Sequence, residues 1–433
     1  MPEILDGSWV IRGARLLDPG NGVDAWSDIW IENGKIAAIG EHACENPHTR
    51  ELDAEGCWVI PGMVELSARL DGVIYRESAL AREGHAALSS GITTCCIPAD
   101  VDPCIDTPAV AELIQLRARQ NTPLRVATLG ALTVSLAGEQ LSEMRALQEV
   151  ACVGLTNGRR AISNTLIMRH ALTYARGLGM RVWIYGRDPW LHQAGIVHEG
   201  SMAGRLGLPG IPAEAEAIGI ARDLSLVELC GVRAHFCRIS SAASIRLLMQ
   251  AHERGLPVSA DIAIHHLHLT DESIINFNSL CYVDPPLRSD RDREVLLESL
   301  NHPVVEAICS DHTPLAPEDK GVPFAETYPG IAGMETLLGL TLALCRYGYL
   351  DERRLIYLLT TGPRRLLDIE TATLQCGAPA DLTLIDPDTY WRVDPERFLG
   401  VGRNTPYKDW VLSAKVRHTI LGSRIYGSDV TSA

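Results

Sequence analysis

The chain has 433 residues, of which 46% are hydrophobic and 21% are charged, so a disordered chain is excluded. A net charge of −15 argues against nucleic acid and anionic membrane surfaces as partners. No apolar run reaches the roughly 18 residues that a membrane-spanning helix needs, and the first residues, MPEILDGSWVIRG, lack the basic and apolar parts of a signal peptide. We therefore expect a cytoplasmic protein.

Short strands and turns fill the first 60 residues. The stretches SWVIRGARLLD, DIWIENGKIAAIG and GCWVIPG are separated by turn signals such as PGNG, which predicts a small β-module over residues 1–60. A similar pattern of short strands occurs again over residues 372–433, in ADLTLIDPDTYWRV and WVLSAKVRHTILGSRIYG. The two ends of the chain most simply complete one β-sandwich.

Residues 61–371 alternate between apolar strands and amphipathic helices. Strands are predicted at 63–70, 92–98, 125–132, 152–156, 181–186, 232–240, 257–264 and 306–311. Eight strand–helix units over this length are typical of an α/β fold of the (β/α)8 barrel type. A doubly wound sheet is the alternative, because a count of strands does not distinguish the two folds.

Several stretches resemble a known family over nearly the whole chain. They include NGKIAAIG, VIPGMVEL, GITT, HFCRISSAAS, DPPLRSDRDREVLLESL, CSDHTPLAPEDKGVPFAETYPGIAGMETLL and GRNTPYKDW. With these residues the sequence resembles the dihydroorotases of the cyclic amidohydrolase superfamily. The resemblance implies a metal-dependent barrel with a composite β-sandwich. It also implies an activity in which two metal ions polarise a cyclic amide carbonyl and turn water into hydroxide.

The positions where this family has metal ligands hold residues of another kind. Where strand 1 of the family ends in Asp-x-His-x-His, this chain has ELSAR; serine is a poor zinc ligand, and a guanidinium does not ligate at all. A carboxylated lysine on strand 4 is impossible, because no lysine lies between positions 36 and 319. The replaced metal positions are Ser67, Arg69, Asn157 beside Thr156, Tyr185 and Arg238, and the strand-8 acid, Asp311, is kept.

The positions that bind substrate in the family are altered as well. Asp71 stands at or beside the place of an arginine that grips the substrate carboxylate, and an acid there repels an anion. Ala99 replaces an asparagine that follows strand 2. His266, Arg288 and His312 match pocket residues of the family, but their segments also shape loops and packing, so a structural role is compatible with their retention.

Two arginines stand where the family has metal ligands. We expect Arg69 and Arg238 to point inward and to neutralise Asp311 and Glu65 in buried ion pairs, because a buried acid without its metal needs a partner. The alternative is that both arginines extend to the mouth of the barrel and keep their charges in water.

The histidines allow a functional and a structural interpretation. His235 keeps the first histidine of the strand-6 motif and is predicted to be a hydrogen-bonded core residue. His266 and His268 form an HxH pattern that could hold a relocated metal. However, the resemblance places it on a strand-7 segment that does not ligate metal, and we favour a structural role.

The lost ligands and the resemblance together predict a catalytically inactive dihydroorotase homologue without a metal cofactor. The resemblance implies a structural subunit that associates with the aspartate carbamoyltransferase catalytic chain in pyrimidine biosynthesis, in a hetero-oligomer and with a homodimer also allowed. One alternative is an active cyclic amidohydrolase with an atypical mononuclear zinc site built from Asp311, His235 and the histidines at 265–268. Another is a metal-free barrel that binds a ligand.

Overall fold

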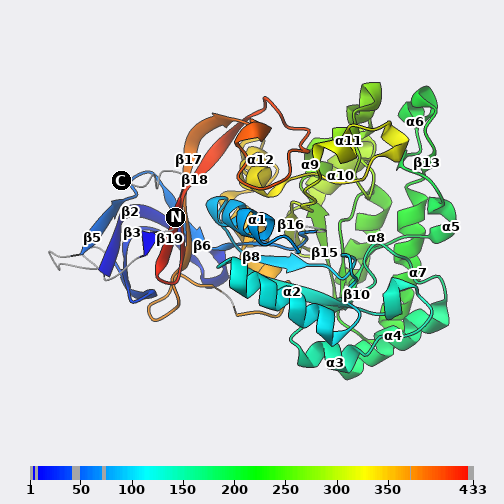
Figure 1. The fold of residues 1–433 in the computed structure, drawn as a ribbon, viewed down its shortest axis with the longest axis horizontal. Coiled ribbons are helices and arrows are strands. Elements are labelled where there is room, and N and C mark those ends of the chain that lie inside the picture. The colour runs from blue at the N-terminus through cyan, green and yellow to red at the C-terminus, as the bar shows by residue number, and fades with distance from the viewer. Residues whose placement is uncertain (1–2, 5–7, 41–48, 71–74, 371, 428–433) are drawn as a thin grey trace.

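The computed structural model describes residues 3–4, 8–40, 49–70, 75–370 and 372–427. A barrel of parallel strands surrounded by helices occupies one side of the molecule, and an antiparallel-rich sheet built from both ends of the chain occupies the other (Figure 1). In the described part of the chain, no helix combines the length and the apolar character needed to cross a bilayer.

Eight parallel strands form the barrel in the order in which they occur along the chain. They are β7 (Met63–Glu65), β8 (Ile92–Ile97), β9 (Arg125–Ala131), β10 (Gly154–Thr156), β11 (Val182–Ile184), β14 (Ala234–Phe236), β15 (Val258–Ala263) and β16 (Val305–Cys309).

The first and last strands meet just beyond their carboxyl ends. Ala68 pairs with His312 in a parallel bridge, and the backbone N–H of Arg69 donates to the His312 carbonyl at 2.7 Å. A doubly wound sheet reverses its strand order at a switch point, whereas this order runs around a barrel. The predicted (β/α)8 barrel is therefore confirmed, and the doubly wound alternative is wrong.

Helices cover the outer face of the barrel. The longer ones are α1 (Glu77–Ser89), α2 (Pro108–Asn121), α3 (Met144–Glu149), α4 (Thr165–Gly177), α6 (Ser201–Leu206), α7 (Glu214–Cys230), α8 (Ala242–Glu253), α10 (Asp290–Ser299), α12 (Met334–Arg346), α13 (Glu352–Leu359) and α14 (Thr361–Leu366). The shorter ones are α5 (Pro189–His192), α9 (His265–His268) and α11 (Pro317–Lys320). A short parallel pair, β12 (Val197–His198) and β13 (Gly210–Ile211), lies beside α6.

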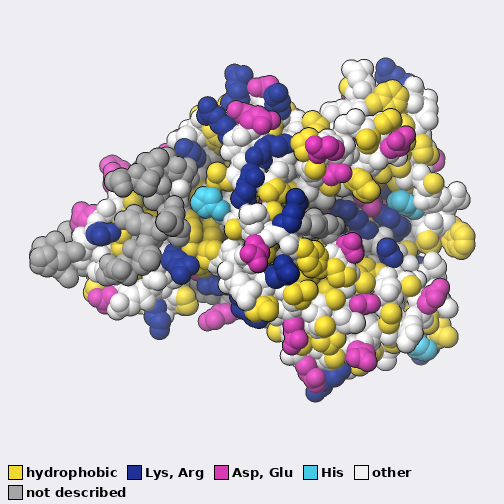
Figure 2. Space-filling view, in the orientation of Figure 1, with side chains coloured by type: hydrophobic (Ala, Val, Ile, Leu, Met, Phe, Trp, Pro, Cys, Tyr) yellow, Lys and Arg dark blue, Asp and Glu magenta, His cyan; other side chains and the backbone are white. Residues whose placement is uncertain are grey.

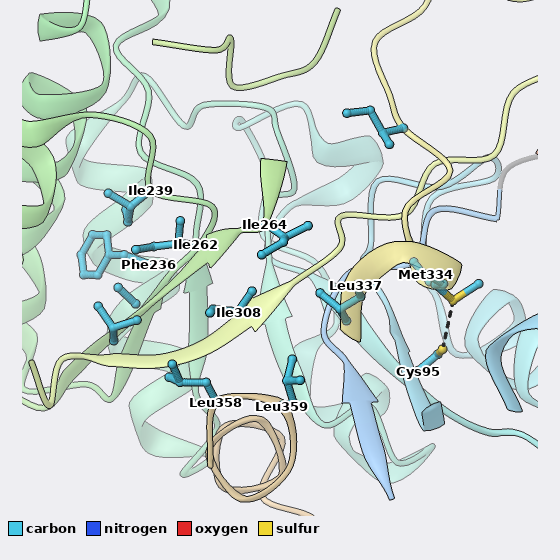
Figure 3. Packing of buried hydrophobic residues seen from close by; sticks show 14 of the residues in the cluster. Cys95, Phe236, Ile239, Ile262, Ile264, Ile308, Met334, Leu337, Leu358 and Leu359 are labelled. Carbon is cyan, nitrogen blue, oxygen red and sulfur yellow. Dashed lines mark hydrogen bonds between the residues drawn. The ribbon is translucent and has the colours of Figure 1, made fainter. Parts of the chain in front are cut away.

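Alternate residues of neighbouring strands form the layer between barrel and helices. Phe236, Ile262 and Ile308 come from three adjacent strands, and of these Ile308 lies nearest to Leu358 and Leu359 of α13 (Figure 3). All five side chains are fully buried. Because side chains alternate across a strand, the residues between these apolar ones face the barrel interior, which is where the polar site residues are found.

Both ends of the chain contribute strands to one nine-stranded sheet. Its strands are β1 (Glu3–Ile4), β2 (Ser8–Asp18), β3 (Val23–Glu32), β4 (Lys35–Ile39), β5 (Arg50–Asp53), β6 (Trp58–Pro61), β17 (Asp381–Arg392), β18 (Val411–Leu421) and β19 (Arg424–Gly427). β6 lies between β17 and β2, so the amino-terminal and carboxyl-terminal parts complete each other as predicted. The sheet encloses a separate apolar core that includes Leu16, Ile29, Leu382 and Ile420. The exact domain limits at residues 60 and 371 stay predictions.

A buried ion pair joins the barrel to this sheet. Arg364 of α14 donates from Nη2 to Asp381 Oδ2 at 2.9 Å, and the two side chains are 2% and 3% exposed. The same Nη2 also donates to the Gly62 carbonyl and to Thr93 Oγ1, each at 3.1 Å. The first residue of β17 is thereby held against the amino-terminal end of the barrel.

Candidate functional site

The carboxyl ends of the first and last barrel strands bring three of the predicted residues together. Asp311 Oδ1 accepts hydrogen bonds from Ser67 Oγ at 2.7 Å and from Arg69 Nη1 at 2.6 Å. The Arg69 and Asp311 side chains are each 3% exposed. The predicted buried ion pair of Arg69 with an acid of this site is therefore confirmed for Asp311.

A second arginine and a second aspartate complete the ion-pair network. Arg159 Nη2 lies 2.9 Å from Asp311 Oδ2, so both carboxylate oxygens of Asp311 face a guanidinium group. Asp100 Oδ2 accepts from Arg69 Nη2 at 3.3 Å and from the backbone N–H of Arg159 at 3.1 Å. The sequence analysis missed Arg159 and Asp100. Both follow the carboxyl end of a strand, β10 and β8, and this position is the signal that would have found them.

Arg238 is the third arginine around Asp311 and makes the loosest contact. Its Nε lies 3.8 Å from Asp311 Oδ1, which is beyond hydrogen-bond distance, and its guanidinium carbon lies 5.7 Å from the centre of the Tyr185 ring. The backbone N–H of Arg238 donates to Asp261 Oδ1 at 2.7 Å. The side chain is 4% exposed, so the alternative in which both arginines extend into water at the barrel mouth is wrong.

The charge state of Asp311 follows from these neighbours. Burial by itself would raise the pKa of Asp311, but Arg69, Arg159 and Arg238 hold this pKa well below its usual range. An aspartate held in this way is ionised and is a weak base. It is therefore poorly suited to take a proton from an attacking water.

Glu65 does not join the arginines, which corrects the expectation that an arginine neutralises it. Its carboxylate accepts from the backbone N–H of Ser67 through Oε1 and from that of Ser310 through Oε2, both at 2.8 Å. The side chain is fully buried, and this burial raises its pKa to about 7. Two backbone N–H groups therefore satisfy this acid instead of an opposite charge.

Two other replaced metal positions have local partners of their own. Asn157 accepts from Thr133 Oγ1 at 2.6 Å and donates to the carbonyls of Leu136 and Arg160, so it holds the loops around β9 and β10. Tyr185 donates from its hydroxyl to Asp284 Oδ1 at 3.1 Å.

The same Asp284 oxygen accepts from Arg187 Nη2 at 2.5 Å. Burial works against ionisation of Asp284, but Arg187 and Arg159 lower its pKa to about 2. Of the two altered substrate positions, Ala99 is fully buried, and Asp71 lies outside the described residues.

The three retained pocket residues lie in structural contacts. His266 Nε2 is 3.2 Å from the Pro285 carbonyl. Arg288 donates to Ser240 Oγ at 3.1 Å and to the Ile211 carbonyl at 2.8 Å. His312 Nε2 is 3.0 Å from Glu83 Oε2 of α1, and its Nδ1 accepts from the backbone N–H of Gly333 at 3.2 Å. Each of these contacts ties one loop of the barrel to a neighbouring element.

The HxH pattern does not lie on strand 7, which is a second correction. β15 ends at Ala263, and residues His265–His268 form the short helix α9 that follows it. His268 Nε2 donates to the Leu340 carbonyl at 2.9 Å, whereas His266 faces the Pro285 carbonyl. His268 therefore binds helix α12 and His266 binds the loop at Pro285, so the two side chains do not converge on a shared ligand.

His235 is a hydrogen-bonded core histidine, as predicted. Its Nδ1 lies 2.9 Å from Ser259 Oγ and its Nε2 lies 2.8 Å from Asp261 Oδ2, and the side chain is fully buried. Its partners are residues of β15, so the described contacts do not bring it to Asp311. These contacts therefore give no support to a mononuclear site that contains both Asp311 and His235.

The described residues contain one group with metal-ligand spacing. The ligand atoms of His235, Cys237 and Asp261 all lie within 4.8 Å of one another. Burial raises the pKa of the Cys237 thiol to about 12, while metal ligation needs the thiolate. Asp261 already binds His235 and the backbone N–H of Arg238. The potential ligand atoms of this group already form hydrogen bonds within the protein, so the group fits a metal ion poorly.

The binuclear metal centre implied by the resemblance does not fit the side chains around Asp311. Among the described residues, the groups that contact its carboxylate are a serine hydroxyl and the guanidinium groups of Arg69, Arg159 and Arg238, and one imidazole, that of His265, interacts with it electrostatically. A guanidinium carries no free lone pair for a cation and repels it electrostatically. The positive charges that two metal ions would bring are supplied here by arginine side chains.

Known proteins match this chain along almost its full length. The family model described as dihydro-orotase-like matches residues 56–244. A dihydroorotase-like protein of Pseudomonas aeruginosa is 42% identical over 416 residues, covering 96% of this chain and 98% of that protein. A dihydroorotase of Anaeromyxobacter dehalogenans is 38% identical over 419 residues, covering 96% of each chain.

Solved structures agree on the fold. An L-hydantoinase (dihydropyrimidinase) from Arthrobacter aurescens superposes with a TM-score of 0.85 at 22% identity and covers 98% of this chain and 97% of that one. A D-hydantoinase superposes with the same TM-score at 18% identity. At these identities the likeness concerns the fold alone. The curated relatives, at much higher identity over nearly the whole chain, decide the family: this chain belongs to the dihydroorotase-like family of the cyclic amidohydrolases.

Proposed function

We propose that this protein is a non-catalytic dihydroorotase homologue that acts as a structural subunit. The single observation that carries the proposal is the arginine centre, by which we mean Arg69, Arg159 and Arg238 around Asp311. It occupies the end of the barrel where the carboxyl ends of the first and last strands meet. In barrels of this type the chemistry takes place at that end.

The arginine centre lacks the groups that hydrolysis of a cyclic amide needs. Metal-assisted hydrolysis requires a Lewis acid on the carbonyl oxygen and a water whose pKa the metal lowers. A guanidinium can donate hydrogen bonds to a carbonyl, but it does not generate hydroxide. Asp311 is held ionised by its arginines and is too weak a base to replace that function.

Elemental analysis and a hydrolysis assay test the loss of catalysis. We expect less than stoichiometric zinc in the protein purified without chelator, and no ring opening of dihydroorotate after zinc is added. A metal-dependent dihydroorotase, purified in the same buffers, is the positive control for both measurements. One or two zinc ions per chain with hydrolytic activity would contradict the proposal.

We propose the aspartate carbamoyltransferase catalytic chain as the partner, and this part rests on the resemblance of the sequence. Two exposed apolar side chains on paired strands support a protein partner. On the long β17–β18 arm, Tyr390 is 64% exposed and Val411 is 60% exposed. Exposed apolar residues that lie together on one element are typical of association surfaces. The net charge of −15 also favours a protein over nucleic acid.

Co-expression of the two chains, followed by size-exclusion chromatography with light scattering, tests the partner. We expect one hetero-oligomer, and we expect Tyr390→Asp with Val411→Asp to dissociate it. Leu229→Asp is the matched control, because Leu229 is 64% exposed on α7, away from that arm. If only separate species elute at micromolar concentrations, the structural-subunit proposal is wrong and a ligand-binding barrel becomes the leading hypothesis.

A further inference from the structure

Arg238 makes the loosest side-chain contact with an acid in the arginine centre. Arg69 and Arg159 share the two carboxylates of Asp311 and Asp100 in contacts of 3.3 Å or less. Arg238 lies 3.8 Å from Asp311 and forms no closer pair with an acid. Asp261, which accepts from His235 and from the backbone N–H of Arg238, supplies a further negative charge beside this guanidinium.

The other acids near Arg238 are already bound to different groups. Asp261 accepts from His235 and from the backbone N–H of Arg238, and Asp284 accepts from Tyr185 and Arg187. Glu65 accepts from two backbone N–H groups. Among the described residues, no carboxylate is left to form a close pair with the Arg238 guanidinium.

The arginine centre and a histidine that interacts with it contain unpartnered polar atoms. The Nε of Arg238 and both ring nitrogens of His265 are buried and have no hydrogen-bond partner among the described residues. His265 lies at the start of α9, is 1% exposed, and interacts electrostatically with both Asp311 and Arg159. Buried donors are rarely left unsatisfied in proteins, so these atoms indicate a group that they bind.

We propose that the arginine centre binds a small oxyanion, a carboxylate or an inorganic phosphate, between Arg238, Arg159 and His265. Guanidinium groups recognise the paired oxygens of carboxylate and phosphate with two parallel hydrogen bonds. The bound anion accepts hydrogen bonds from the unpartnered donors. This inference concerns the same site as the proposed function and rests on the absence of a metal pair there.

The mouth of the barrel provides a positively charged approach. Arg159 and Arg187 are each 15% exposed, so they connect the buried part of the centre with solvent. On the face shown in Figure 2, Lys and Arg side chains gather in the recess between the lobe that carries α6 and β13 and the lobe that carries α4 and α7. Basic groups in a recess raise the local concentration of anions. The small exposure of Arg238 restricts the ligand to a small ion or to one carboxylate of a larger molecule.

Isothermal titration calorimetry on the full-length protein tests this inference. Sodium phosphate and sodium acetate are titrated separately at constant ionic strength in chloride, after dialysis against EDTA. We expect one saturable site per chain. The anion that binds more strongly shows whether the site prefers a phosphate or a carboxylate. If neither anion saturates below about 10 mM, or if both produce the same heats as chloride, the inference is wrong.

Two substitutions with opposite expected effects assign the site. Arg238→Met should weaken anion binding about tenfold or more, because it removes the guanidinium whose Nε has no partner. Asp311→Asn should strengthen binding about tenfold, because it removes the acid that competes for the same arginines. The second substitution keeps the test decisive if the first variant fails to fold. Arg254→Met, at an exposed pair with Glu228, is the matched control and should leave the affinity unchanged.

The result of the anion titration can be distinguished from the result of the zinc and hydrolysis measurements that test the proposed function. A protein without zinc and without hydrolysis that also binds no anion contradicts only this inference. Anion binding that is present before dialysis against EDTA and absent afterwards would show that a metal ion carries it, which would contradict both.

Discussion

Arg69 and Asp311 form a buried ion pair that joins the first and last strands of the barrel: Nη1 lies 2.6 Å from Oδ1, and each side chain is 3% exposed. The two residues are 242 positions apart in the chain. The acid stands where the family has a metal ligand, and the arginine stands where the family has a histidine. One substitution at position 69 therefore removes a ligand and supplies the charge that the remaining acid needs.

Replacing this arginine should destabilise the fold. We expect Arg69→Met to lower the free energy of unfolding by about 3 kcal/mol, because a buried Asp311 loses its strongest partner. Chemical denaturation followed by circular dichroism measures the change. Arg254→Met is the control, because its pair with Glu228 is 61% and 52% exposed and such pairs contribute about 1 kcal/mol or less. An equal effect in the two variants would contradict this account of the pair.

Restoring the strand-1 histidines should not restore a metal centre. The double variant Ser67→His, Arg69→His regains the family pattern at two positions, while Asn157, Tyr185 and Arg238 still replace the other ligands. We expect less than one zinc ion per chain by elemental analysis and no dihydroorotate hydrolysis. Assembly with the proposed partner should persist, because the substituted side chains are buried within the barrel. Stoichiometric zinc in this variant would show that two histidines and Asp311 are a sufficient site.

The ion pair between barrel and sheet should matter for overall stability. Arg364→Met leaves Asp381 with the half-exposed Arg125 as its remaining ion-pair partner, and we expect a loss of about 3 kcal/mol in the free energy of unfolding. Arg392→Met is the control, because Arg392 and its partner Asp409 are 69% and 65% exposed. A sheet that unfolds separately from the barrel in Arg364→Met, seen as two transitions, would agree with this role. A change no larger than that of the control would contradict it.

His268 should make the protein less stable in mild acid. Burial lowers its pKa to about 4, so between pH 6.5 and 4 the unfolded chain binds a proton at this position that the folded chain does not. The free energy of unfolding therefore falls as the pH is lowered through this range.

We expect His268→Gln, which can still donate to the Leu340 carbonyl, to reduce this fall by about 2 kcal/mol. Denaturation series at several pH values measure the effect. His170→Gln, on the exposed side of α4, is the control. An unchanged pH profile in His268→Gln would show that this histidine is not the group that titrates.

The fold could be predicted from the sequence because its periodicity is local. Buried strands such as Ile92–Ile97 and Val258–Ala263 are short apolar runs, and the helices between them have amphipathic spacing. The loss of the metal ligands at Ser67, Arg69 and Arg238 is also a property of the sequence alone, since the chemistry of a side chain decides whether it can ligate. The error about His266 and His268 arose because a four-residue helix directly after a strand has no periodicity to reveal it.

The composition of the arginine centre was decided only by the tertiary structure. Arg159 and Asp311 are 152 residues apart, and Arg69 and Asp100 are 31 apart, so no local pattern relates them. Closure of the barrel brings the carboxyl ends of different strands together. The charged side chains at these ends thereby become neighbours. The sequence by itself determined the barrel and the missing ligands, because both follow from residue type and short-range spacing. Which acid each arginine binds, and that Arg238 keeps an unpartnered Nε, depend on distances that only the folded chain defines.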